Sequence, residues 1–229
     1  MTTTRILRAA LRLARRAVVY EIGLWRSLFR WVTRRPTVSG SDEAFGYVAV
    51  VRPLLLTFIV VSAIEIPAVD LLLSHTLDWP ALRHTAIALG VYGVLWMIGL
   101  LAAMQVHPHV VADSGLRVRS GTTVDFTVPW DAVADIAARQ RSTPSGKTVE
   151  IEQVGDRRIG HVGVADQTNV DVRLRAPQGV PMREGLSEPV AELRLYADDP
   201  DALVAAARLR LPVVAPARSL PLDPRCSSG

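Results

Sequence analysis

Two carboxylic acids lie inside an otherwise uncharged stretch of the chain, where burial constrains their chemistry most strongly. Glu65 is near the middle of an apolar run from about Pro53 to Leu73, and Asp70 follows it in the same run. A charge at the centre of a bilayer costs about 2.5–3.5 kcal/mol on insertion scales, so such a group is expected to be protonated, paired or turned toward another helix. Glu65 and Asp70 are therefore the residues from which a proton or ion path would be built.

The second apolar run offers partners for both carboxyls. If the chain folds back on itself between the two runs, Glu65 lies at the depth of Tyr92. Asp70 then lies near the outer interface, close to Arg83 and His84. We expect Glu65 to accept a hydrogen bond from Tyr92, and Asp70 to contact Arg83 or His84. A structural role is favoured, because one carboxyl and one tyrosine on two helices are too few groups to carry protons across a membrane.

The histidines are the next candidates for chemistry. His107 and His109 flank Pro108, and side chains two residues apart on a strand point the same way, an arrangement that can help bind a metal. His161 is the nearest further ligand and is distant in the sequence. We therefore expect no metal site.

Other catalytic signatures are missing from the sequence. Asp113 and Asp131 are interpreted as turn residues, and the chain has no Gly-rich phosphate loop, no nucleophile elbow and no zinc signature. Cys226 is the single cysteine, which excludes a disulfide framework within one chain, and the residues after it are not those of a prenylation signal. We expect no catalytic residue, no cofactor and no enzyme.

These side chains are positioned by two long apolar segments, about 53–73 and 84–104. Twenty-one helical residues rise about 31 Å, the thickness of a hydrocarbon core. The segment 74–83 between them is so short that the two must be antiparallel. We predict a transmembrane helical hairpin over 53–104; a buried helix pair of a soluble protein is the alternative.

A basic amphipathic helix is predicted over residues 5–35, within an N-terminal segment 1–36. Its apolar face carries Leu7, Leu11 and Phe29, with Glu21 as the exception. Such a helix lies in the headgroup plane and binds anionic lipids through its basic row. Packing on the protein's own soluble domain, or cleavage as a targeting signal, are the alternatives. The predicted membrane-interface residues are Arg5, Arg8, Arg12, Arg15, Arg16, Arg26, Arg30 and Arg34.

Charge asymmetry orients the hairpin. Residues 1–50 carry nine arginines against three acidic residues, whereas the turn between the apolar segments carries Arg83 alone as a basic residue. By the positive-inside rule, both termini are cytoplasmic and the protein is a multi-pass protein of the cell membrane. After residue 105 the charges nearly balance, so we expect no nucleic-acid binding.

After a linker over 37–52 and the hairpin, residues 105–210 have the short period-two pattern of a β domain. Asp198-Asp199-Pro200 predicts the start of a final helix, with an Asp cap and Pro in its first turn. A Pro-rich tail over 211–229 is predicted to be disordered. The predicted strands are Val106–Ala112, Leu116–Ser120, Thr123–Val128, Val133–Arg139, Thr148–Val154, Arg158–Val164, Val170–Leu174 and Val190–Tyr196.

Residues 107–136, HPHVVADSGLRVRSGTTVDFTVPWDAVADI, carry a family resemblance. Their strand, Asp-Ser-Gly turn, Leu-Arg-Val-Arg strand and Val-Pro-Trp-Asp segment resemble the bacterial PH-like domains that are fused to a pair of membrane helices in uncharacterised actinobacterial membrane proteins. The resemblance implies an α+β membrane protein with a PH-like antiparallel barrel or sheet capped by a helix. It implies binding or scaffolding. Phosphoinositide recognition is not carried over, because Arg117 and Arg119 have no Lys neighbours.

Two functions remain open from the sequence. The first is a non-enzymatic membrane anchor that presents a cytoplasmic PH-like domain to a protein partner or to a second copy. The alternative is a small transport-related or proton-coupled membrane protein that uses Glu65 and Asp70.

Overall fold

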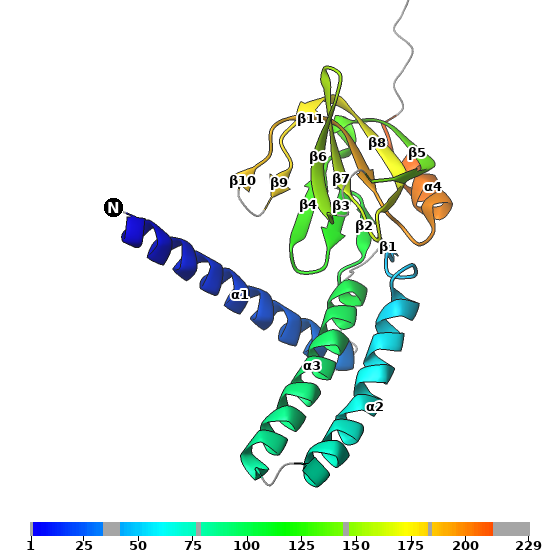
Figure 1. Ribbon diagram of the computed structural model, residues 1–229. Helices are drawn as coiled ribbons and strands as arrows, with labels where there is room; N and C mark the ends of the chain where they lie inside the picture. Colours follow the sequence, from blue (N-terminus) through cyan, green and yellow to red (C-terminus); the bar gives the residue numbers. More distant parts are fainter. Residues whose placement is uncertain (1, 34–41, 77–78, 144–146, 183–184, 213–229) are drawn as a thin grey trace, which may run out of the picture.

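The computed structural model describes residues 2–33, 42–76, 79–143, 147–182 and 185–212. The fold is α+β, with three long helices below a β domain and a short helix at its side (Figure 1). The predicted tail lies almost entirely outside the described residues. The helices are α1 (Thr2–Val32), α2 (Arg52–Thr76), α3 (Pro80–Val106) and α4 (Pro200–Arg210).

Helices α2 and α3 form the antiparallel hairpin that the sequence predicts (Figure 1). Both are long and apolar enough to cross a membrane, by length and composition. All residues of α2 are described and none is buried, while the buried residues of α3 lie at its C-terminal end, from Gly99 to Val106. Pro80 occupies the first turn of α3, where its missing N–H costs nothing. Apolar side chains therefore cover the outside of the hairpin, away from any protein core.

A four-stranded antiparallel sheet stands directly above the hairpin, in the order β1-β2-β3-β4. Strand β1 comes from the segment 37–52 that was expected to be a linker, and it pairs with β2 after the hairpin has intervened. The first sheet thus joins the two ends of the hairpin. Its strands are β1 (Glu43–Phe45), β2 (His109–Ala112), β3 (Gly115–Ser120) and β4 (Val124–Val128).

The second sheet has five strands in the order β5-β8-β11-β7-β6. Between β8 and β11 in the sequence, β9 and β10 form a separate two-stranded sheet. Strands β7 and β11 are parallel, and the other pairs are antiparallel. Its strands and those of the small pair are β5 (Val133–Ser142), β6 (Val149–Val154), β7 (Arg157–Val162), β8 (Gln167–Gln178), β9 (Pro181–Met182), β10 (Gly185–Leu186) and β11 (Val190–Leu195).

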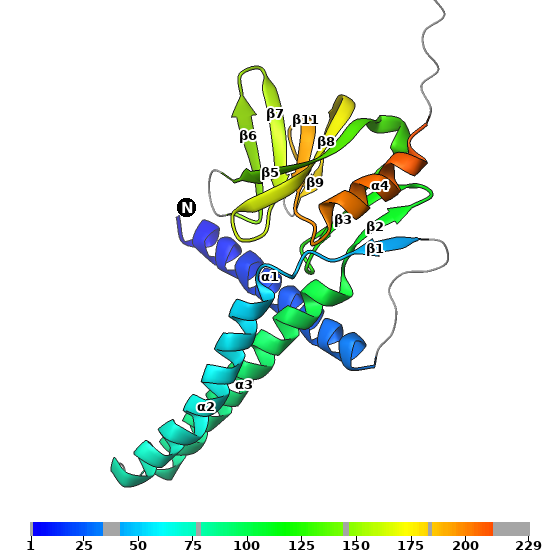
Figure 2. The ribbon, with the colours of Figure 1, turned by 90° about the vertical axis from the view of Figure 1, so that its right-hand side faces the viewer.

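The two sheets do not close into a barrel, so of the barrel or sheet that the resemblance implies, the barrel is wrong. Strand β4 ends at Val128, and the 3-10 turn η1 (Trp130–Ala132) carries the chain into β5 at the edge of the other sheet. The largest hydrophobic core contains residues of both sheets and of α4, including Leu116, Val172 and Leu203. Figure 2 shows α4 running alongside the strands of this domain. The result is two packed sheets whose edges remain separate.

Candidate functional site

Helix α1 packs across the C-terminal half of α3 through its own second half (Figure 2). Leu24 is fully buried and fills a notch at Gly99, where a β-carbon would collide with the leucine side chain. Tyr20 stacks near Trp96 with ring centroids 6.4 Å apart. The second half of α1 therefore packs on α3, while the side chains of its first half that the structure describes are exposed.

The predicted bond between Glu65 and Tyr92 is wrong. The Tyr92 hydroxyl donates to Glu21 of α1 instead, and the Trp25 indole N–H donates to the same carboxylate oxygen at 2.9 Å. Glu21, the exception on the apolar face of α1, thus accepts one hydrogen bond within α1, from Trp25, and one from Tyr92 that connects α1 to α3. Sequence spacing missed this contact because it arises from how α1 crosses the hairpin.

Glu65 lies instead in a shallow groove of about 250 Å³ between α2 and α3. The groove is lined by Ser62, Glu65 and mostly apolar residues of α3. Ile66 packs over Gly90, where a β-carbon would come within 2.8 Å of the isoleucine side chain. Among the described residues, the Glu65 carboxyl has no hydrogen-bond or ion-pair partner.

Asp70 forms the expected contact with Arg83. The guanidinium Nη2 donates to Asp70 Oδ2 at 2.9 Å, and Nε donates to the other carboxylate oxygen. The His84 ring bonds the Pro80 carbonyl at 2.7 Å instead. The ion pair joins the ends of the two helices at the turn of the hairpin, so Asp70 is committed to a structural contact.

Asp198 connects the β domain to the start of α2. Its two carboxylate oxygens accept from the backbone N–H groups of Val48 and Ala49 at 3.0 and 2.8 Å, and its own N–H donates to the Gly46 carbonyl at 2.8 Å. A β-carbon at Gly46 would lie 2.6 Å from the Asp198 carboxylate. This close approach requires glycine, and it fixes the turn from which α2 begins.

Tyr47 and His109 form a buried polar cluster beside this turn. The Gly121 N–H donates to the Tyr47 oxygen at 2.6 Å, and the two rings lie 5.0 Å apart. The Arg119 N–H donates to His109 Nδ1 at 3.1 Å, so Nε2 carries the proton and donates to the Tyr196 carbonyl at 3.0 Å. Burial lowers the pKa of His109 to about 4 and raises that of Tyr47 to about 12. Both side chains are therefore neutral at physiological pH.

The histidine pair serves the fold. His107 bonds the Ala103 carbonyl at 2.8 Å, at the end of α3, while both ring nitrogens of His109 are used inside the sheet. His161 is buried in β7 beside Glu152, with its Nε2 2.9 Å from the carboxylate. Across the described part of the chain, no group of three or more His, Cys, Asp or Glu side chains is arranged to hold a metal ion.

Charged side chains form a cross-strand network on one face of the five-stranded sheet. Asp171 of β8 accepts from Arg141 of β5 at 3.1 Å and lies 3.7 Å from Arg194 of β11, which also bonds Glu192 at 2.7 Å. The opposite face of the same strands carries the core. This alternation is that of a sheet with one buried and one solvated face.

The basic row of α1 is described in part. Arg15, Arg16, Arg26 and Arg30 are exposed. Arg34, and the side chains of Arg5, Arg8 and Arg12, lie outside what the structure describes.

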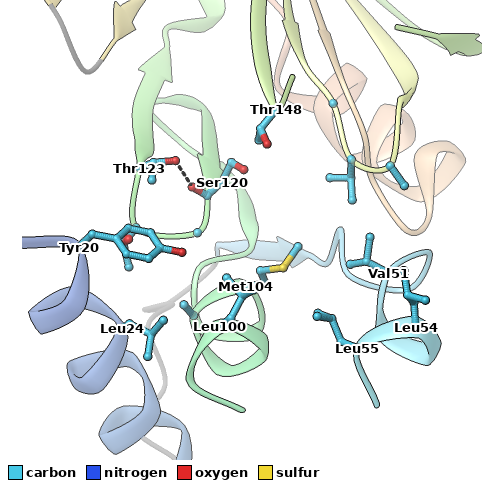
Figure 3. Close-up of a pocket in the computed structure, with 16 residues that line it drawn as sticks. Tyr20, Leu24, Val51, Leu54, Leu55, Leu100, Met104, Ser120, Thr123 and Thr148 are labelled. Atoms are coloured by element: carbon cyan, nitrogen blue, oxygen red, sulfur yellow. Dashed lines mark hydrogen bonds between the residues drawn. The ribbon is translucent and has the colours of Figure 1, made fainter. Parts of the chain in front are cut away.

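A cavity of about 370 Å³ lies where the three long helices meet the β domain (Figure 3). Leu100 and Met104 of α3 and Leu55 of α2 form its lower wall, and the turn between β3 and β4 and Thr148 form its upper wall. Comparison with known protein families, with curated proteins and with solved structures finds no match to this chain.

We predict that Asp198→Ala destabilises the protein by about 1–2 kcal/mol, because two backbone N–H groups lose their acceptor, as at a helix N-cap. The measurement is the thermal unfolding midpoint of the full-length chain in detergent. Asp201→Ala, an exposed substitution in the first turn of α4, is the matched control. Equal midpoints for the two variants would contradict the assigned role of Asp198.

We predict that stability falls as the pH drops from 6.5 toward 4, because His109 takes up a proton in the unfolded chain before it does so in the folded one. The loss is about 1.4 kcal/mol per pH unit over this interval, for this group alone. His109→Gln keeps an acceptor and a donor but does not titrate, so its unfolding midpoint should depend less on pH. His107→Gln should keep the wild-type slope, and an unchanged slope in His109→Gln would refute the assignment.

Proposed function

We propose that this chain is a non-enzymatic membrane anchor whose hairpin spans the bilayer and holds the β domain at the cytoplasmic surface. There the domain is available to a protein partner or to a second copy of the chain. The observation that carries the proposal is that α2 has an apolar sequence and no buried residue, while the β domain has a hydrophobic core of its own. Exposed apolar helices of this length need lipid around them.

The first half of α1 supports the same placement. Leu7, Leu11 and Leu13 are exposed in this half, and the arginines of α1 whose side chains the structure describes are exposed as well, which is the pattern of a helix at a membrane surface. Because its second half packs on α3, α1 is held near the level at which α3 enters the β domain. Anionic lipids are the proposed partners of its basic row.

The PH-like resemblance remains part of the proposal. A helix after the last strand, packed on the core, agrees with it. The parallel pairing of β7 with β11 and the separate sheets depart from a bent antiparallel barrel. Binding or scaffolding rests on this resemblance and on the charged, partly buried face of the second sheet.

The topology has a direct test in spheroplasts that express the full-length chain. Cys226 is the single native cysteine, so a membrane-impermeant maleimide should leave it unlabelled until the membrane is permeabilised. Thr76→Cys in a Cys226→Ser background should be labelled at once, because it lies at the outer turn. Recovery of the wild-type chain in the aqueous fraction without detergent would refute the anchor, and the reverse labelling pattern would refute its orientation.

The transport alternative draws on the unpartnered Glu65 in the groove of the hairpin. Under the anchor proposal, Glu65→Gln should leave the amount of membrane-embedded protein unchanged. Its free energy of unfolding should stay within about 0.5 kcal/mol of wild type, as expected for a substitution that breaks no contact. Ion flux into liposomes that contain the wild-type chain, abolished in Glu65→Gln and retained in Ser62→Ala, would favour transport instead.

A further inference from the structure

We propose that the cavity between the helices and the β domain binds an acyl chain of a membrane lipid whose polar group is uncharged. The lipid enters from the bilayer, so this inference rests on the proposed membrane anchor. The volume of about 370 Å³ falls within the range of about 300–1,000 Å³ that is usual for small-molecule sites.

The two sides of the cavity differ in polarity. Its helical side is aliphatic and includes Leu24, Leu55 and Leu100. Its β side carries the hydroxyls of Ser120 and Thr148, and Figure 3 shows Thr148 projecting into the space above the leucines. An amphiphile with its chain among the leucines and its polar group at the hydroxyls matches both halves.

The lining residues include no Asp, Glu, Lys, Arg or His. An ionised headgroup in this space would lose hydration without gaining an opposite charge, which is unfavourable. An ester, a hydroxyl or an amide, in contrast, exchanges hydrogen bonds with water for hydrogen bonds with threonine and serine. The lining therefore selects a neutral polar group.

The aliphatic wall continues onto the surface that faces lipid. Leu54 lines the cavity and is 58% exposed, in the first turn of α2. A chain from the adjacent leaflet reaches the cavity along this side without crossing a polar surface.

The β side of the cavity ends in an unusual turn. Ala165 and Asp166 both have positive φ, 49° and 61°, in the two-residue connection that pairs Val164 with Gln167. A β-carbon disfavours this conformation, and glycine is the usual residue there. Ala165 of this turn lines the cavity.

The test uses the full-length chain in nanodiscs that contain a diacylglycerol with a diazirine in one acyl chain. Irradiation should label peptides that contain 100–104 and 120–123. Ala103→Trp fills the cavity from a buried position, and labelling of these peptides should fall at least about tenfold. Leu95→Trp, at an exposed position of α3 that lines neither this cavity nor the groove around Glu65, is the matched control and should label as wild type.

A second variant tests the cavity independently, in case Ala103→Trp does not fold. Thr148→Val keeps the shape of an exposed side chain and removes its hydroxyl, so labelling by the neutral lipid should fall severalfold while the unfolding midpoint is unchanged. A membrane-embedded chain labelled only on the outside of the hairpin would overturn the cavity assignment and leave the anchor intact. Equal or stronger labelling of the cavity by a phosphatidic acid with the same diazirine chain would overturn the neutral headgroup.

Discussion

The arrangement of the whole molecule depends on a carboxylate that satisfies backbone donors 150 residues earlier in the chain. Asp198 binds the N–H groups at the start of the turn into α2, and its own backbone bonds Gly46. Unsatisfied N–H groups at the start of a helix carry positive charge, and a carboxylate is the acceptor they bind best. The neighbouring cluster around Tyr47 and His109 supports the same junction from the other side. Together these contacts set the direction in which the hairpin leaves the β domain.

The sequence predicts well those helices and strands that are determined by the residues within them. Helices α2 and α3 contain the predicted segments 53–73 and 84–104, because apolar length alone determines them. Most strands of the β domain were also located, since turn residues such as Gly115 and Gly121 mark their ends; both have positive φ. The contact of Asp70 with Arg83 followed from the shortness of the hairpin turn.

The contacts that sequence did not predict are those that depend on tertiary geometry. Strand β1 is three residues long, too short for a period-two pattern to register. The parallel pairing of β7 with β11 has no local signature. Tyr92 bonds Glu21 because α1 crosses α3 near it, and no spacing within the hairpin contains that information. The cavity between the helices and the β domain was missed for the same reason, since its walls come from six separate segments.

The position of β1 imposes an order on biosynthesis. Since β1 precedes the hairpin and pairs with a strand that follows it, the first sheet cannot assemble until α2 and α3 have left the ribosome. The hairpin, residues 52–106, is therefore complete before the first sheet can form. Asp198 emerges nearly a hundred residues after α3 ends, so the contact that fixes the direction of the hairpin can form only after both of its helices have been synthesised.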